Sequence, residues 1–296
     1  MPNDIGTIYE NEDLTSFNTY HIKTSTRYMI CPNNVNELIN LLNYIDANNY
    51  KYFILGNGSN IILPDTKFNG IVINLKSLNG IEIMPNNELK VMAGAMLPII
   101  ANYAINNNLK GLEWAIGIPG TLGGAIIGNA EAYLCPTMNY VKDIQILTKE
   151  HILKTITPED ITYGYRNTSL KEAKENIVVS ATIKLLPGNK EESLLLVNDR
   201  RARRTASQPL EYPSAGSVFR NPSKDQPAGK LIEEANLKGT RIGDAEISLK
   251  HGNFIVNISQ ANAKDIIALI NLIKKEIKAK NNIDLVCEQE IIDWNW

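Results

Sequence analysis

Two glycine-rich segments in the first half of the chain could bind phosphate groups. The first, Gly56-Asn57-Gly58-Ser59-Asn60, follows the apolar run 52–55, which is typical of a strand. Successive backbone N–H groups in a tight glycine-rich turn form a concave site for phosphate oxygens, and the side chains of Ser59 and Asn60 add donors. An ordinary hairpin turn explains the same residues equally well. This segment alone therefore leaves both interpretations open.

The second segment is Gly117-Ile118-Pro119-Gly120-Thr121-Leu122-Gly123-Gly124-Ala125. Its glycine content argues against a packed helix, and its apolar residues argue against a flexible linker. Glycine allows the backbone to approach a ligand where a Cβ atom would clash. Because both segments lie beside predicted strands, together they fit a dinucleotide lying across sheet edges. The alternative is a tight helix entry packed against a neighbouring element.

A Rossmann fold does not fit the first segment. That fold needs a third glycine at the proper spacing and a helix directly after the turn. Neither is present, and Pro64 disfavours helix at the residue before it. A dinucleotide bound here would therefore use a different fold.

The two segments belong to a longer series of motifs that resembles the UDP-N-acetylenolpyruvoylglucosamine reductase family, shorter type, whose FAD domain is of the vanillyl-alcohol-oxidase (PCMH) kind. The further motifs are Asn18-Thr19, Gly111-Leu112-Glu113-Trp114, Asn129-Ala130, Tyr163-Gly164-Tyr165-Arg166, Gln208-Pro209, the run 214–222, the run 228–233 and the run 253–257. Their joint order along the chain carries the resemblance. Two stretches depart from the family pattern: Glu131-Ala132-Tyr133-Leu134 lacks two of its glycines, and the run 288–293 differs near the C-terminus.

The resemblance implies an α+β protein with a two-part FAD-binding domain and a smaller α+β substrate domain. We expect FAD-binding subdomains at residues 1–75 and 76–189 and a substrate domain at 190–283. The last part, 284–296, would return to the FAD part as a strand carrying the catalytic glutamate.

The resemblance also implies non-covalent FAD and NADPH as the hydride donor. No histidine lies in either glycine segment, whereas many flavoproteins of this superfamily attach the flavin through histidine. No separate NADPH motif is expected, because in this family NADPH uses the substrate's site in turn. The expected FAD contacts are Gly56, Asn57, Gly58, Ser59, Asn60, Gly117, Ile118, Gly120, Thr121, Gly123, Gly124, Asn129 and Ala130.

The implied reaction reduces UDP-N-acetylglucosamine-enolpyruvate to UDP-N-acetylmuramate, a step of peptidoglycan precursor synthesis, with hydride passing from NADPH through FAD N5. Arg166 matches the family's catalytic arginine, and a guanidinium can grip a carboxylate and stabilise an enolate. Ser217 matches the proton donor and Glu288 the catalytic glutamate. Without the resemblance, Arg166 reads as a surface arginine and Ser217 as a turn serine.

Glu290 competes with Glu288, because alternate residues of a strand share a face. The resemblance favours Glu288, because its spacing from Leu285 is similar to the family's. Tyr165, Asn221 and Arg204 are the expected substrate contacts. Arg204 belongs to a cluster of four arginines that could neutralise the UDP diphosphate, or could simply form the solvated face of a helix: Arg200, Arg201, Arg203 and Arg204.

Two other functions are consistent with the chain. One is a different FAD-dependent oxidoreductase of the same superfamily, which would share the glycine segments but not the motifs around Arg166 and Ser217. The other is a catalytically silent flavin-binding sensor, favoured only by the altered stretch 131–134. Retention of Arg166, Ser217 and Glu288 argues against a silent binder.

Composition narrows the class of protein further. Lys and Arg number 30 against 32 Asp and Glu, which argues against a nucleic-acid partner. No apolar run predicts a membrane span, and the N-terminus lacks a secretory pattern, so we expect a cytoplasmic monomer. The 3 cysteines have no paired spacing and there are only 3 histidines, so no metal site is expected.

Periodicity predicts the elements that position these residues. Helices are expected near 35–45, 97–104, 194–204 and 261–280. Strands are expected near 52–55, 61–64, 71–73, 81–83, 141–147, 177–186, 254–256 and 285–292. The mixture lacks a strict βαβ rhythm, which favours α+β, and a boundary is expected near Pro187-Gly188.

Overall fold

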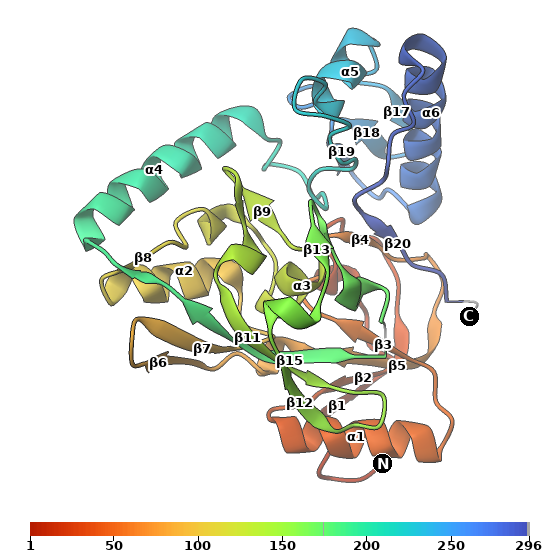
Figure 1. Ribbon diagram of the computed structural model, residues 1–296. Helices are drawn as coiled ribbons and strands as arrows, with labels where there is room; N and C mark the ends of the chain where they lie inside the picture. Colours follow the sequence, from red (N-terminus) through yellow and green to blue (C-terminus); the bar gives the residue numbers. More distant parts are fainter. Residues whose placement is uncertain (174, 295–296) are drawn as a thin grey trace. The chain divides into compact units, whose positions relative to one another are not determined.

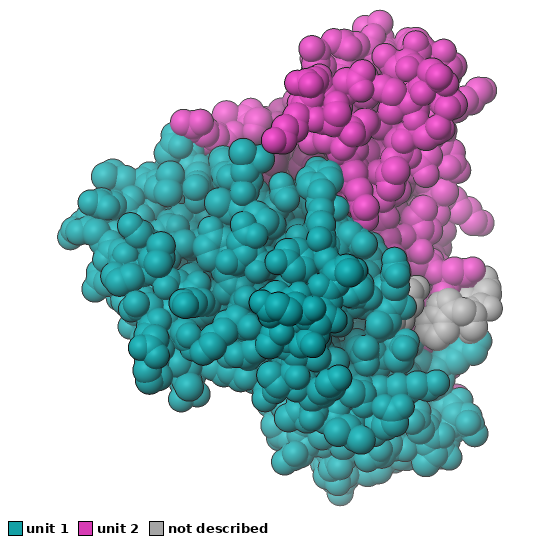
Figure 2. Space-filling view, viewed as in Figure 1, with its two compact units in different colours: residues 1–10, 28–56, 70–202 teal, residues 11–27, 57–69, 203–296 magenta. Residues whose placement is uncertain are grey.

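The computed structural model describes residues 1–173 and 175–294, which divide into two compact units (Figure 2). Unit 1 contains residues 1–10, 28–56 and 70–202. Unit 2 contains residues 11–27 and 57–69 and the chain from 203 onward. Both units combine helices with strands, so the predicted α+β class is confirmed.

The first sheet of unit 1 has the strand order β1-β2-β5-β3 (Figure 1). Its strands are Thr7–Glu10, Thr26–Cys31, Phe68–Asn74 and Tyr52–Leu55 in that order. The helix α1, Val35–Ala47, begins where the Asn34 side chain accepts a hydrogen bond from the Glu37 N–H at 3.0 Å. Its apolar residues at helical spacing are buried in one cluster with those of the sheet.

The second sheet of unit 1 is antiparallel, in the order β12-β11-β15-β7-β6. These strands are Leu153–Ile156, Val141–Leu147, Ile177–Lys184, Glu88–Met92 and Ile81–Met84. The central strand β15 is buried along almost its whole length, and α3, Leu122–Ile127, packs against it and β7. The helix α2, Leu97–Asn106, contributes to the same apolar core.

Short elements complete unit 1. Three small two-stranded sheets pair β8 with β16, β9 with β10 and β13 with β14. Their strands are Leu109–Lys110, Leu186–Pro187, Glu131–Ala132, Cys135–Pro136, Tyr163–Gly164 and Asn167–Thr168. The helix α4, Lys190–Ser207, starts in unit 1 and buries only Ser193 and Val197. Turns of 3₁₀ helix lie at 75–77, 115–117, 137–139, 158–160 and 169–171 in this unit, and a further turn lies at 15–17 in unit 2.

Unit 2 has a three-stranded antiparallel sheet and two helices around one apolar core (Figure 1). Its strands are β17 (Arg241–Ile242), β18 (Ala245–Ile247) and β19 (Ile255–Asn257). The helices are α5, Ala228–Glu234, and α6, Ala263–Asn281. A separate parallel pair joins β4, Ile61–Ile62, to β20, Glu290–Ile291.

The helices predicted from periodicity are present with slightly different ends, and the strand predicted at 141–147 has those bounds. The prediction of one continuous strand at 285–292 is wrong. Residues 286–288 form backbone hydrogen bonds with residues 218–220, whereas residues 290–292 form them with residues 60–62, which include β4. Because the segment changes partner at Gln289, only Glu290–Ile291 forms a regular strand.

The prediction that the second glycine segment forms no packed helix is also wrong, since Gly123 and Gly124 lie in α3. A Cβ atom on Gly123 would lie 3.1 Å from the Ala93 Cβ, so the glycine lets the helix lie close to its neighbour. Within residues 1–173 and 175–294, no helix is both long and apolar enough to cross a membrane. The same residues contain no cluster of His, Cys, Asp and Glu suited to a metal ion.

Candidate active site

The loop 215–219, which contains Ser217, is held by side-chain amides on both of its ends. On one end Asn253 accepts the Phe219 N–H at 2.9 Å through Oδ1 and donates to the Phe219 carbonyl at 2.8 Å through Nδ2. The Val218 N–H donates to the Asn253 backbone carbonyl at 2.9 Å. Asn253 is 4% exposed, so these bonds are shielded from competing water.

On the other end Gln289 Nε2 donates to the carbonyls of Ala215 at 3.1 Å and Gly216 at 3.2 Å. Its Oε1 accepts the hydroxyl hydrogen of Tyr20 at 2.9 Å. Tyr20 is fully buried, and that burial raises the pKa of its phenol, so it stays a neutral donor. Every polar atom of this buried amide is therefore satisfied by a defined partner.

Ser217 itself is half-buried, and its side chain makes no hydrogen bond to any residue of the described chain. Gly216 precedes it with φ +76°, a conformation that side chains rarely adopt, although a Cβ atom there would meet nothing within 4 Å. The loop is thus fixed by its backbone while the serine hydroxyl remains available to a ligand.

Glu288 and Glu290 have different surroundings, which periodicity could not reveal. The Glu288 N–H donates to the Val218 carbonyl at 2.8 Å, next to Ser217. The Glu290 N–H donates instead to the Asn60 carbonyl at 2.9 Å, at the start of β4. Unit 2 therefore brings Glu288, rather than Glu290, to the Ser217 loop.

Arg166 lies in unit 1, at the tip of the hairpin formed by β13 and β14. Its φ is +57°, and its guanidinium carbon lies 5.9 Å from the centre of the Tyr165 ring. Asn129 Nδ2 donates to the Gly164 carbonyl at 2.8 Å, and Thr168 Oγ1 donates to the Ile127 carbonyl at 2.9 Å. These two bonds anchor the arginine-bearing hairpin to the end of α3.

The two glycine segments meet within unit 1 at Gly56 and Thr121. A Cβ atom on Gly56 would lie 2.7 Å from Thr121 Oγ1, so only glycine permits this approach. Thr121 caps α3 by accepting the Gly124 N–H at 3.4 Å, and its own N–H and that of Gly120 have no acceptor in the described chain. Gly56, the first residue of its segment, thus lies against the start of α3.

The rest of the first segment lies in unit 2. Gly58 has φ +63°, and a Cβ atom there would lie 2.2 Å from the Phe17 carbonyl oxygen. Among the described residues, the N–H groups of Gly58, Ser59 and Asn60 find no protein acceptor. Three successive unused backbone donors suit the phosphate oxygens of a dinucleotide such as FAD.

The remaining predicted FAD contacts differ in what they can offer. Each polar atom of the Asn129 side chain has a protein partner, Nδ2 the Gly164 carbonyl and Oδ1 the Met138 N–H at 3.1 Å. The Asn129 backbone N–H donates to the Ile126 carbonyl at 3.1 Å, so the second Nδ2 hydrogen is the donor that Asn129 can offer to a ligand. The Ala130 carbonyl accepts the Thr137 hydroxyl at 2.7 Å. Gly117 and Ile118 are half-buried at the end of a 3₁₀ turn. Asn57 is half-buried, and Gly124 is exposed.

The altered stretch 131–134 forms a hairpin whose two turn residues, Tyr133 and Leu134, have φ of +56° and +62°. Two left-handed turn residues are the arrangement that asparagine and glycine favour, so a tyrosine and a leucine at these positions leave strain in the turn. The Tyr133 ring lies 4.6 Å from the Arg200 guanidinium carbon, and its hydroxyl donates to the Arg200 carbonyl at 3.3 Å. The strained turn is thereby tied to α4.

The predicted substrate contacts are spread over both units. Tyr165 is 45% exposed in unit 1. In unit 2, Asn221 Oδ1 accepts the Ala228 N–H at 3.0 Å at the start of α5, while Arg204 lies half-buried in α4. Sequence reasoning missed Gln289 and Asn253 as residues of this site, because an amide carries no charge that would single it out.

A cavity of about 560 Å³ lies elsewhere in unit 1, beside the first turns of α4. The buried Glu113 at its edge accepts the Ser193 hydroxyl at 2.7 Å and the Gly111 N–H at 2.9 Å. Burial, with a smaller contribution from Cys135, raises the pKa of Tyr140 to about 12. None of these groups belongs to the predicted site.

Comparison with known proteins defines the class first. The family model described as "FAD binding domain" matches residues 26–153. Berberine bridge enzyme from Eschscholzia californica is similar in fold, with a TM-score of 0.50 at 14% identity over 64% of this chain and 42% of that one. With the unused backbone donors described above, these matches indicate an FAD-binding domain of the predicted type.

The particular family follows from the second half and from whole-chain relatives. The model described as "UDP-N-acetylenolpyruvoylglucosamine reductase, C-terminal domain" matches residues 208–292. Relatives named UDP-N-acetylenolpyruvoylglucosamine reductase from Caldanaerobacter subterraneus subsp. tengcongensis and Carboxydothermus hydrogenoformans are 39% and 38% identical, over 97% and 96% of this chain and 94% of each relative. The crystal structure of the enzyme of that name from Thermus caldophilus has a TM-score of 0.82 at 31% identity, over 97% of this chain and 100% of that one. The chain belongs to the UDP-N-acetylenolpyruvoylglucosamine reductase family, as its motifs predict.

Proposed function

We propose that this protein reduces UDP-N-acetylglucosamine-enolpyruvate to UDP-N-acetylmuramate, with bound FAD and with NADPH as hydride donor. Family membership supports the substrate class. The observation that carries the chemistry is the Ser217 loop, in which a rigidly held backbone presents a serine hydroxyl without a protein partner in the described chain, beside Glu288.

Bound FAD supplies hydride from NADPH to the terminal carbon of the enolpyruvyl group. The protein must then stabilise negative charge on the substrate carboxylate and deliver one proton to the carbon that bears the ether oxygen. In our proposal Arg166 binds the carboxylate through two N–H groups, and Glu288 polarises the enolpyruvyl group. Ser217 donates the proton from its hydroxyl, and proton uptake from solvent restores it.

The UDP-sugar would be held by Tyr165, Asn221 and Arg204. The Asn221 oxygen already caps α5, which leaves its amide nitrogen as the donor for a phosphate or sugar oxygen. We assign FAD binding to residues 1–75 and 76–189, substrate binding to 190–283 and the returning glutamate to 284–296. We also propose that the protein acts as a monomer in the cytoplasm.

The test is NADPH oxidation by the FAD-loaded protein, followed by the loss of NADPH absorbance, with and without the enolpyruvyl substrate. We expect oxidation that depends on the substrate and falls by at least about a hundredfold in Ser217→Ala, as for loss of a general acid. Ser223→Ala, at an exposed serine of the same unit, is the matched control and should keep full activity.

Two outcomes would count against the proposal. FAD binding without substrate-dependent oxidation would contradict the substrate and leave a different oxidoreductase or a flavin-binding sensor. Full activity of Ser217→Ala would contradict the proton donor alone.

A further inference from the structure

We propose that His251 is a positioning residue for Ser217, acting through Asn253, and that protonation of its imidazole releases the Ser217 loop. This inference rests on the proposed role of Ser217 as proton donor. In this proposal His251 contacts neither substrate nor cofactor, yet it determines whether the Ser217 hydroxyl is correctly placed.

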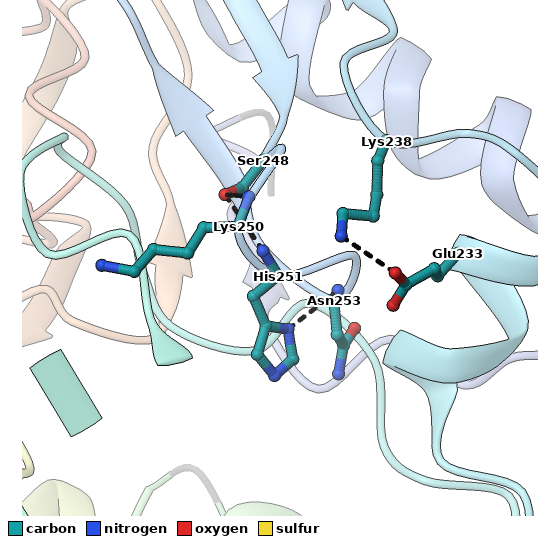
Figure 3. A network of polar contacts seen from close by, with 6 residues as sticks. All are labelled: Glu233, Lys238, Ser248, Lys250, His251 and Asn253. Atoms are coloured by element: carbon teal, nitrogen blue, oxygen red, sulfur yellow. Dashed lines mark hydrogen bonds and ion pairs between the residues drawn. The ribbon is translucent and has the colours of Figure 1, made fainter. Parts of the chain in front are cut away.

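The first step is the bond between His251 and Asn253, shown in Figure 3. The His251 Nδ1 atom accepts the backbone N–H of Asn253 at 3.1 Å. An imidazole nitrogen accepts a hydrogen bond only when it carries no proton, so the ring must be neutral with its hydrogen on Nε2. Protonation of Nδ1 would place two hydrogens against each other and break this contact.

The second step runs from Asn253 to Ser217. Asn253 forms three hydrogen bonds with the two residues that follow Ser217: one with the Val218 N–H at 2.9 Å, and two with the backbone of Phe219 at 2.9 and 2.8 Å. A shift of the Asn253 backbone therefore moves both its own carbonyl and its side chain. Because catalysis is sensitive to displacements of about 1 Å, such a shift reaches the serine hydroxyl.

The ring has little room to find another arrangement. The backbone N–H of His251 donates to Ser248 Oγ at 3.3 Å, and the backbone N–H of Lys250 donates to the same atom at 3.1 Å (Figure 3). The Phe254 ring lies 4.9 Å away, edge-on. A Cβ atom on Gly229 would lie only 3.1 Å from the His251 Cε1 atom. A protonated ring therefore has to displace the turn 248–253 rather than rotate away.

The charges near His251 come from α5 and the two following segments. Glu233 lies on α5, Lys238 follows it and forms an ion pair with Glu233 at 3.1 Å, and Lys250 is the neighbour in the chain (Figure 3). Lys250 points to other partners, the Thr205 carbonyl at 2.7 Å and the Glu211 carboxylate at 3.9 Å. Burial is the main cause that lowers the pKa of His251, and Lys238 adds to it, whereas a backbone hydrogen bond at His251 and the charge of Glu233 oppose it. The ring thus stays neutral at neutral pH and is protonated only in acid.

The first measurement is the pH dependence of kcat for three FAD-loaded proteins. In the wild type we expect kcat to fall in acid. His251→Asn places an uncharged Oδ1 acceptor where Nδ1 was, as in an Asx turn, so it should keep kcat at neutral pH and lose the acid limb. His251→Phe keeps a ring but has no acceptor, and it should lower kcat about tenfold at every pH, with KM nearly unchanged, as for loss of one buried hydrogen bond. His151→Asn is the matched control, because the His151 ring bonds Asn43 and Asp46 instead, and it should keep the wild-type profile.

The second measurement requires no catalysis. Amide hydrogen exchange of the peptide spanning residues 214–222, read by mass spectrometry, should be about tenfold faster in His251→Phe than in wild type at neutral pH, and unchanged in His251→Asn. An acid limb that persists in His251→Asn, or equal exchange in wild type and His251→Phe, would overturn the inference. If the wild-type protein does not catalyse the proposed reaction, but the exchange rates of the three proteins differ as expected, the proposed function is wrong and the positioning role of His251 stands.

Discussion

Gln289 donates to the Gly216 carbonyl at 3.2 Å while accepting the Tyr20 hydroxyl at 2.9 Å. One buried amide therefore joins three parts of unit 2 that lie far apart in the sequence. It stands at the residue where the C-terminal segment leaves the Ser217 loop and begins to pair with β4. The geometry of the Ser217 loop thus depends on the segment 286–289 near the C-terminus.

Gln289→Ala should lower the free energy of unfolding by about 2–4 kcal/mol, because it leaves a cavity and deprives the Tyr20 hydroxyl and two loop carbonyls of their partner. Urea unfolding measures this directly. The matched control is Gln260→Ala, since the exposed Gln260 side chain accepts a hydrogen bond from the Lys23 ammonium group, and the substitution leaves the bond from the Gln260 backbone N–H to Asp244 in place. Its effect should stay within about 0.5 kcal/mol. Equal effects of the two substitutions would show that the buried amide does not stabilise the loop.

Gly216→Ala should destabilise the protein by about 1–2 kcal/mol even though the new methyl group meets no atom within 4 Å, because its φ of +76° is unfavourable for alanine. We also expect a loss of kcat, since relief of the strain would turn the Ser217 peptide. Gly80→Ala is the control, at a glycine with ordinary φ whose Cβ would only touch Met92 at 3.4 Å. A neutral Gly216→Ala would mean that the loop relaxes freely.

Glu288→Gln and Glu290→Gln should differ strongly. Both substitutions keep the size of the side chain and remove its charge. Only Glu288, however, is hydrogen-bonded through its backbone to the Ser217 loop. We expect Glu288→Gln to lower kcat by at least about a hundredfold, as for loss of a group that stabilises the transition state, and Glu290→Gln to retain most activity. Steady-state kinetics at saturating substrate make the comparison. The reverse order would assign the catalytic carboxylate to Glu290.

The sequence predicted most helices and strands because their apolar spacing is local information. It could not predict the division of 285–292, since alternation looks the same whether a strand has one partner or two in succession. The motifs predict roles for Ser217 and Glu288, but the resemblance did not single out Gln289 or Asn253. Their role follows from which backbone groups are left without partners in the fold, a property of tertiary structure that residue types alone do not reveal.

Leu134→Gly should stabilise the protein by about 1 kcal/mol. Leu134 is 81% exposed with φ +62°, so its side chain contributes little packing while its backbone is strained. Tyr133→Gly is the informative partner, because it relieves similar strain but removes the ring that lies over Arg200 and the bond to the Arg200 carbonyl. Thermal unfolding should therefore rank Leu134→Gly above both wild type and Tyr133→Gly. A lower Tm for Leu134→Gly would show that the leucine side chain stabilises the folded state.

The stability of the protein should decrease in acid partly through His251. Its pKa is lowered in the folded state from 6.5, chiefly by burial, so the unfolded chain takes up the proton first as the pH falls. The neutral His251 ring therefore contributes to the free energy of unfolding. This contribution is complete above about pH 6.5 and is lost as the pH falls through 6.5 toward the folded-state pKa of His251. His251→Asn, which cannot be protonated, should therefore show a smaller loss of unfolding free energy between neutral and mildly acidic pH. Urea unfolding at a series of pH values measures the difference, with His21→Asn as a control at an exposed histidine. If the free energy of unfolding changes with pH in the same way for wild type and His251→Asn, then the His251 ring accepts a proton as readily in the folded protein as in the unfolded chain.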